Sequence, residues 1–123
     1  MAYDESNIFA KILRGEMPCN LIYEDDHNIA FHDINPQAPT HVLVLPKGKY
    51  TSYTDFAENA SDEEIVSFTK AVAKVAREVK IVDPGYRILS NDGPDSHQEV
   101  PHLHIHLLAG KPLGPMVITD FSA

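Results

Sequence analysis

Residues 102–108 decide the fold, and they read His102-Leu103-His104-Ile105-His106-Leu107-Leu108. Histidines alternate with aliphatic residues along this stretch. Successive side chains of a β-strand point to opposite faces of the sheet, so strict alternation indicates a strand. We therefore expect a final strand over 102–108 with two unlike faces. Leu103, Ile105 and Leu107 share an apolar face that can pack on a helix, and the three histidines share the other face.

The histidine face predicts a chemical site. Burying three imidazoles without hydrogen-bond partners costs free energy, so we expect these rings to look into a site. Same-face neighbours lie about 7 Å apart along a strand, and one small tetrahedral group could touch two of them. With an unperturbed pKa of ~6.5, one ring can act as a nucleophile while its neighbour donates a proton. The loop Asn91-Asp92-Gly93 offers further donors for phosphate oxygens.

Spacing alone leaves two other interpretations of the histidines open. Histidines in a strand are often ordinary core or surface residues. Two histidines at i and i+2 on a strand also form a common zinc pair, and His32 or His41 could supply another ligand. On spacing, a metal site and a phosphate site are about equally supported.

Upstream of this stretch, the pattern predicts a short helix and several strands. Ser6 or Asn7 can cap a helix that runs to about Arg14 and ends at Gly15. Strands are expected over 21–24, 28–33, 41–45 and 86–90.

The clearest helix begins at Ser61, because Ser61 and Glu64 form a capping box. Apolar residues then recur every three or four positions and predict one buried stripe, made of Ile65, Phe68, Val72, Val75 and Val79. The element order is one short helix, three strands, one long helix and two strands. This order predicts an α+β fold with a five-stranded, mainly antiparallel sheet.

Composition excludes several classes of protein. The chain has 123 residues, which is the length of one domain. Ten Lys and Arg face eighteen Asp and Glu, and the net charge of −8 disfavours a nucleic acid polymer as partner. The single cysteine, Cys19, allows no disulfide within the chain and no cysteine zinc cage. We find no secretion signal and no apolar run of the ~20 residues that a membrane span needs, so we expect a soluble, cytoplasmic protein.

Five segments together resemble one family, the histidine triad (HIT) proteins, and within it the HINT branch. They are 7–12, 22–26, 31–41, the histidine stretch 102–108, and 110–116, so the resemblance covers the chain from Asn7 to Met116. It implies a HIT-like fold in one domain over 1–123, with a core of about 7–110. It also implies a homodimer in which two five-stranded sheets join, with the tail 111–123 at the edge of the dimer and the active site.

The resemblance also implies a reaction, the hydrolysis of purine nucleoside 5′-phosphoramidates such as AMP joined through nitrogen to an amine or lysine. No metal or cofactor is expected. His104 would attack the α-phosphorus and form a nucleotidyl-histidine, and water would then release AMP or GMP. His102 would accept a hydrogen bond from His104 through its backbone carbonyl. His106 would donate to a phosphate oxygen, and His41 would support the cluster.

Further residues of the HINT pattern are expected to bind substrate. Asp33 would accept from the ribose hydroxyls, and Asn91 would contact phosphate. An apolar slot for the purine would be lined by Phe9, Ile12, Met17, Phe31 and Ile34. His32, Gln98 and Glu99 complete the expected substrate-binding set.

The loop before the triad departs from the common pattern. Many relatives have glycine at the position of His97 and an aromatic residue at that of Pro101. Glu99 stands where some relatives carry a serine thought to assist the leaving amine. The identity of the proton donor to the leaving group is therefore open.

Two other functions are alternatives. A dinucleoside polyphosphate hydrolase of the FHIT branch would use the same histidines with a nucleotide leaving group. A nucleotide-binding or zinc-binding regulatory protein would need no catalysis. The segment from Asp33 to His41 favours the HINT interpretation over the FHIT one.

Overall fold

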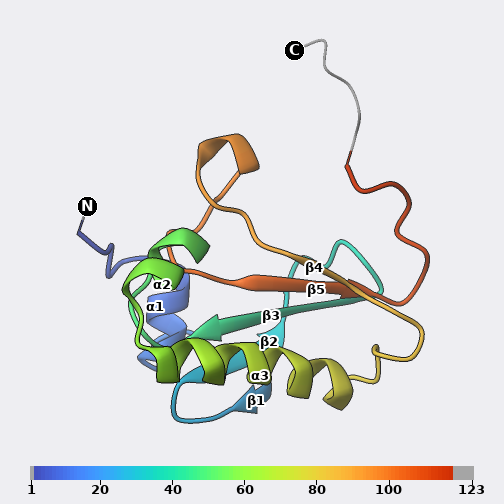
Figure 1. Ribbon diagram of the computed structural model, residues 1–123, viewed down its shortest axis with the longest axis horizontal. Helices are drawn as coiled ribbons and strands as arrows, with labels where there is room; N and C mark the ends of the chain where they lie inside the picture. The colour runs from blue at the N-terminus through green and yellow to red at the C-terminus, as the bar shows by residue number, and fades with distance from the viewer. Residues whose placement is uncertain (1, 118–123) are drawn as a thin grey trace.

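The computed structural model describes residues 2–117, and its elements form one α+β unit around a five-stranded sheet (Figure 1). In chain order they are α1 (Ile8–Leu13), β1 (Asn20–Glu24), β2 (Asn28–His32), β3 (Thr40–Pro46), α2 (Tyr53–Asn59), α3 (Asp62–Glu78), β4 (Arg87–Leu89), the 3-10 helix η1 (Pro94–Ser96) and β5 (Ile105–Ala109). The strand order is β1-β2-β3-β5-β4, and every neighbouring pair is antiparallel. The prediction of an α+β fold with a five-stranded antiparallel sheet is confirmed.

The prediction of only one long and one short helix is wrong, because α2 and η1 are additional. Ser52 caps α2, and its side chain accepts a hydrogen bond from the backbone N–H of Asp55. This Ser-x-x-Asp spacing is a local helix start signal, so α2 could have been predicted from the sequence. The last strand is also shorter than predicted at its start, because β5 begins at Ile105.

Both predicted helix starts are correct. Asn7 caps α1 through its side chain, and the helix stops before Gly15, which has a φ of +78°. Ser61 and Glu64 form the expected capping box at the start of α3. Among residues 2–117, no helix combines the length and the apolar character needed to cross a bilayer.

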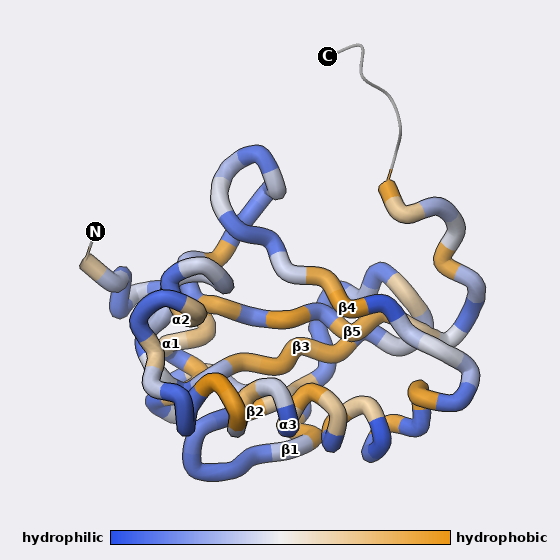
Figure 2. Tube along the Cα trace, viewed as in Figure 1, coloured by the Kyte–Doolittle hydropathy of each residue, from blue (hydrophilic) through white to orange (hydrophobic). Residues whose placement is uncertain are grey.

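The larger core lies between α3 and one face of the sheet, here called the α3 face. It contains fully buried strand residues such as Val42, Val44 and Leu107, together with Phe68 and Val75 of α3. In Figure 1, α3 lies over the sheet and runs roughly alongside β3, and Figure 2 shows hydrophobic stretches along β3, β5 and α3. The predicted stripe of α3 therefore packs on the sheet, with its ends at Ile65 and Val79 only partly buried.

A smaller core lies on the opposite face, here called the α1 face. Phe9 of α1 packs there with Ile29, Phe31, Leu43 and Leu45 of the sheet. The described part of the tail, residues 111–117, follows β5, and the Arg87 guanidinium of β4 donates to the carbonyl of Gly114 at 2.9 Å. The tail therefore lies beside the edge strand. Residues 118–123 of the predicted tail lie outside the described residues.

Candidate active site

Four imidazoles gather on the α1 face. His106 pairs with Leu43 across β5 and β3, and His41 pairs with Leu108, which places both histidines on this face. The ring centroids of His104 and His106 lie 5.0 Å apart, and those of His41 and His106 lie 5.1 Å apart. Leu103, Ile105 and Leu107 lie instead in the core of the α3 face. The predicted alternation of the two faces is therefore correct, although residues 102–104 precede the hydrogen-bonded strand.

The Phe9 ring closes the α1 end of this cluster. It meets the His104 ring edge to face at a centroid distance of 4.8 Å, and the His102 ring at 6.4 Å. His102 is fully buried and His104 is 8% exposed. Both rings are thus shielded from bulk water, which lets short polar contacts determine their protonation.

The backbone carbonyl of His102 determines which nitrogen of His104 carries a proton. Nδ1 of His104 lies 2.7 Å from this oxygen, which can only accept. A neutral His104 therefore carries its proton on Nδ1 and a lone pair on Nε2. Nε2 takes part in no hydrogen bond within residues 2–117. This is the tautomer that a nucleophilic histidine needs.

A second chain of hydrogen bonds orients His106. The backbone N–H of Gln37 donates to Nδ1 of His41 at 3.0 Å, so the proton of a neutral His41 sits on Nε2. That nitrogen lies 2.8 Å from Nδ1 of His106 and donates to it. The proton of His106 is therefore on Nε2, which is buried and has no partner among the described residues. A buried donor without a partner is costly, and an incoming oxygen acceptor would satisfy it.

Burial keeps the cluster neutral. Desolvation lowers the pKa of His102, of His104 and of His41 below the ordinary histidine value. The pKa of His106 falls to about 4, first through desolvation and then through repulsion from His104 and His41. At neutral pH these rings are uncharged, so His104 keeps its lone pair and His106 donates as a neutral N–H.

Asp33 lies beside this cluster. Its Oδ2 is 3.4 Å from Nε2 of His41, and its Oδ1 accepts from the backbone N–H of Asn35 at 2.8 Å. Each carboxylate oxygen has lone pairs left for another donor. The loop that carries Asp33 approaches β5 closely, because a Cβ at Gly110 would lie 2.6 Å from Cβ of Pro39.

Asp33, His41 and His106 form the group within residues 2–117 that could hold a metal ion, since their ligand atoms lie within 4.8 Å of one another. Their geometry fits a hydrogen-bonded cluster better. Two imidazole nitrogens on one tetrahedral zinc at 2.0–2.1 Å would be separated by about 3.3 Å. The facing nitrogens of His41 and His106 are 2.8 Å apart, and each already has an acceptor or donor role.

The expected apolar slot is only partly assembled. Phe9, Phe31 and Ile12 belong to the core cluster of the α1 face, whereas Met17 is 41% exposed and Ile34 is 80% exposed. His32 is not brought to the cluster. It pairs with Val42, a residue of the α3-face core, and alternation therefore places His32 on that face.

The loop residues that were expected to bind substrate mainly stabilise the conformation of the loop. Nδ2 of Asn91 donates to the carbonyl of Ser96 at 2.6 Å. The Gln98 amide bonds the backbone of Gly93, Thr51 and Val100. Glu99 is exposed and pairs with His97 at 2.9 Å. His97 has a φ of +63°, a left-handed conformation that explains why glycine suits this position.

Two residues that touch the cluster were not predicted from the sequence, Tyr3 and Gln37. The Tyr3 hydroxyl bonds Nδ1 of His102, and Gln37 acts through its backbone N–H. Neither residue type carries a local pattern that points to a histidine far along the chain.

The fold and the site define a class of small α+β proteins in which an antiparallel sheet presents a buried histidine cluster. The comparisons agree with this class, because the model of the HIT domain family matches residues 14–113. The chain belongs to the HIT family.

Three relatives illustrate the similarity. A HIT-like protein of Azospirillum brasilense is 58% identical over 94% of each chain. A purine nucleoside phosphoramidase of Escherichia coli is 41% identical over 92% of this chain and 94% of that protein. The solved structure of a histidine triad protein from Clostridium difficile has a TM-score of 0.80 and 44% identity, and covers 93% of this chain and 98% of that one.

Proposed function

We propose that this protein hydrolyses purine nucleoside 5′-phosphoramidates through a covalent nucleotidyl-His104 intermediate. One observation carries the proposal. Nε2 of His104 is free and holds a lone pair, next to His106, whose Nε2–H is buried and unpartnered among residues 2–117. A nucleophile beside a fixed donor is the arrangement that phosphoryl transfer needs. The similarity to a purine nucleoside phosphoramidase supports the P–N bond as the target.

The reaction proceeds in two displacements. Nε2 of His104 bonds to the α-phosphorus while the P–N bond breaks, and the leaving nitrogen takes up a proton from solvent water to depart as the amine. His106 donates to a phosphoryl oxygen, where negative charge grows in the transition state. Water then attacks the same phosphorus, the P–His104 bond breaks, and the nucleoside monophosphate is released. Two lower barriers replace one high barrier.

The rest of the nucleotide would lie along the α1 face. Asp33 accepts hydrogen bonds from ribose hydroxyls through its remaining lone pairs. The exposed Ile34 contacts the base, and burying its apolar surface stabilises the complex.

The decisive experiment offers two substrates to untagged protein in one mixture. An adenosine 5′-phosphoramidate of a primary amine competes with a diadenosine polyphosphate, and both losses are followed by chromatography. We expect the phosphoramidate to disappear first, and rapid quenching followed by peptide mass analysis to locate adenylate on His104. Preferential loss of the diadenosine substrate would favour the FHIT-type alternative. Stoichiometric zinc with chelator-sensitive activity would favour the zinc-binding alternative.

We further propose that the protein acts as a homodimer joined along β4. This strand is one of the two edges of the sheet, and Ile88 at its centre is 55% exposed. Beside it lies a groove of about 420 Å³, lined in part by Tyr53, Phe56 and Ile65. A second copy would pair the free strand edge and cover these apolar side chains. Sedimentation should give a dimer for the wild type and a monomer for Ile88→Asp.

A further inference from the structure

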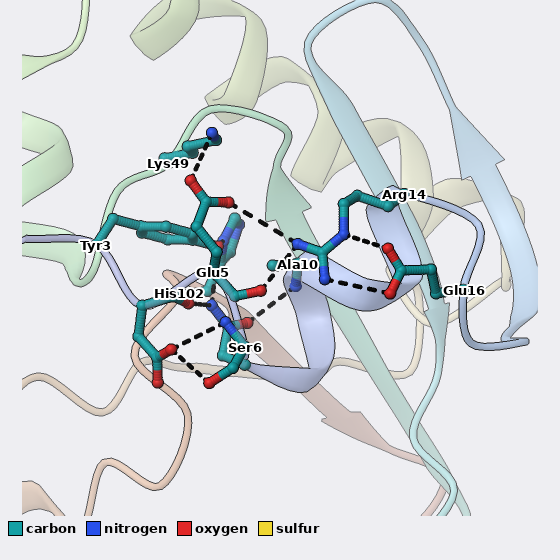
Figure 3. A network of polar contacts seen from close by, with 10 residues as sticks. Tyr3, Glu5, Ser6, Ala10, Arg14, Glu16, Lys49 and His102 are labelled. Carbon is teal, nitrogen blue, oxygen red and sulfur yellow. Dashed lines mark hydrogen bonds and ion pairs between the residues drawn. The ribbon is translucent and has the colours of Figure 1, made fainter.

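The N-terminal segment touches the histidine cluster from outside the sheet. Oη of Tyr3 lies 2.5 Å from Nδ1 of His102, and the two rings meet edge to face at 5.6 Å (Figure 3). Nδ2 of Asn7 donates to the same hydroxyl at 2.9 Å. Asn7 is buried and also caps α1 through its side-chain oxygen. A residue almost at the start of the chain therefore contacts the first histidine of the triad.

The direction of each hydrogen bond in this chain follows from its ends. Nε2 of His102 lies 2.8 Å from the carbonyl oxygen of Pro46, which can only accept, so the proton of a neutral His102 sits on Nε2. Nδ1 then carries a lone pair, and the Tyr3 hydroxyl donates to it. The Asn7 amide donates to the oxygen of Tyr3. Protons thus point one way, from Asn7 through Tyr3 and His102 to Pro46, and every ring nitrogen of His102 is satisfied.

The ring of His102 and the proton of His104 are linked through one residue. The backbone carbonyl of His102 holds Nδ1–H of His104 at 2.7 Å. With both of its nitrogens bonded and no exposed surface, the His102 ring has one orientation. The peptide that carries the carbonyl is held on its other side by the N–H of Leu103, which donates to the carbonyl oxygen of Tyr50 at 2.8 Å. Removing the Tyr3 hydroxyl would leave a buried lone pair without a donor, and the ring would have to rotate or change tautomer to recover one.

An ion pair and a hydrogen bond from a charged side chain hold this segment against the rest of the fold. The Glu5 carboxylate lies 2.7 Å from Nζ of Lys49, in the loop after β3, and the Arg14 guanidinium donates to the Glu5 carbonyl at 2.8 Å (Figure 3). These groups are exposed, so each contact contributes little to stability. Together with the Asn7 cap they hold Tyr3 over His102 in one place.

We propose that Tyr3 is a positioning residue for the nucleophile: its hydroxyl locks His102, and the carbonyl of His102 in turn holds His104 in the Nδ1–H tautomer. The inference rests on the proposed function for its kinetic consequence. Its structural consequence, the tautomers of two histidines, can be measured without any substrate.

The test compares Tyr3→Phe with Tyr23→Phe. Tyr23 is the matched control, because its hydroxyl makes a 2.7 Å hydrogen bond to Asp25 on the β1 side of the sheet, away from the histidine cluster. Each variant loses one hydroxyl. Tyr3→Phe loses the two partly buried hydrogen bonds to His102 and Asn7, and Tyr23→Phe loses one. We expect Tyr3→Phe to lower kcat by about tenfold with KM changed less than about twofold, and Tyr23→Phe to leave both constants unchanged. Equal kcat values for Tyr3→Phe and wild type would overturn the inference.

Nitrogen NMR of the imidazoles supplies a second readout. In the wild type we expect His102 to be protonated on Nε2 and His104 on Nδ1 alone, and in Tyr3→Phe we expect His104 to populate both tautomers. A purely structural role would lower the melting temperature of both variants and leave His104 in one tautomer. If Tyr3→Phe does not fold, the wild-type spectrum still decides, because a proton on Nδ1 of His102 contradicts donation by Tyr3. Wild-type protein with the expected tautomers and no phosphoramidase activity would refute the proposed function and leave the positioning intact.

Discussion

The two faces of β5 carry opposite kinds of side chain on one backbone. On the α3 face, Ile105 and Leu107 are buried in the larger apolar core. On the α1 face, the preceding His104 is nearly as well shielded and His106 is partly buried, yet each of their nitrogens needs a partner or a use. Aliphatic side chains are satisfied by any close-packed neighbours. Imidazoles are satisfied only by particular atoms at particular distances, so the α1 face depends on many distant segments.

This difference indicates that one face of the sheet mainly stabilises the fold and that the other mainly serves the proposed reaction. The α3 face should contribute mainly to the free energy of unfolding. The α1 face should contribute mainly to the reaction, and its buried polar groups hold an arrangement rather than maximise stability. Substitutions on the two faces should therefore have separable effects.

The largest effect is expected on the α1 face, at the nucleophile. His104→Ala should lower kcat for a phosphoramidate by at least about a thousandfold, because the proposed covalent intermediate forms on Nε2 of this residue. AMP binding, measured by calorimetry, should stay within a few-fold of wild type. His27→Ala, at a partly exposed histidine paired with Glu63, is the control and should keep full activity. Undiminished turnover by His104→Ala would exclude the assigned nucleophile.

A large effect on the free energy of unfolding, and not on activity, is expected on the α3 face. Leu107 is fully buried, and Leu107→Ala should lower the free energy of unfolding by about 2–5 kcal/mol through lost transfer energy and the cavity left behind. Urea denaturation followed by circular dichroism measures this loss. Well below the melting temperature, kcat of the folded protein should be close to that of wild type. A loss of kcat as large as the one in His104→Ala would show that the faces are not separable.

A pH titration should reveal the buried imidazoles. Burial lowers the pKa of His102, His104 and His106, the last to about 4, whereas the unfolded chain has an ordinary pKa of ~6.5. Above this ordinary value both states are neutral, and the histidines make stability independent of pH. Below it the unfolded chain binds more protons, so the free energy of unfolding should fall between about pH 6.5 and pH 4. The acid limb of kcat/KM should likewise have its midpoint below pH 6.5.

In His104→Ala, the decline in stability over this pH range should be shallower than in the wild type, because one buried imidazole is gone. Leu107→Ala should keep the wild-type slope. An equal slope in His104→Ala and wild type would contradict a lowered pKa for His104.

The smallest effect is expected at the helix that covers the α3 face. Ser61 caps α3, and Ser61→Ala should lower the free energy of unfolding by about 1 kcal/mol. Activity at neutral pH should not change, which thermal melting and a single assay can check together. A loss of kcat in Ser61→Ala would show that α3 influences the opposite face of the sheet.

Much of the fold could be predicted because its signals are local. The Ser61 capping box, the stripe of α3 and the alternation around Ile105 each depend on residues two to four positions apart. α2 was missed although Ser52 and Asp55 mark its start. The position of His32 was missed because strand pairing, which the sequence does not state, decides the face on which it lies.

The sequence predicted which histidines form the site better than it predicted what the surrounding loop residues contact. His104, His106 and His41 meet as expected, and the carbonyl of His102 lies where His104 needs it. Asn91 and Gln98 are held instead by the backbone of their own loop. Hydrogen-bonding capacity can be read from residue type, but the partner that uses it cannot.

The sequence alone determined which side chains share a face of the last strand, and it determined where α1 and α3 begin. Both follow from backbone geometry that repeats over a few residues. The proton of His104 and that of His41 follow from contacts only two and four positions away. Only the tertiary structure decided which nitrogen of His102 and of His106 carries the proton. For His102 the deciding atoms lie 56 positions away at Pro46 and 99 at Tyr3, and for His106 the deciding atom lies 65 positions away at His41. A tautomer is determined by an acceptor or donor within about 3 Å, and folding is what brings such distant atoms to that distance.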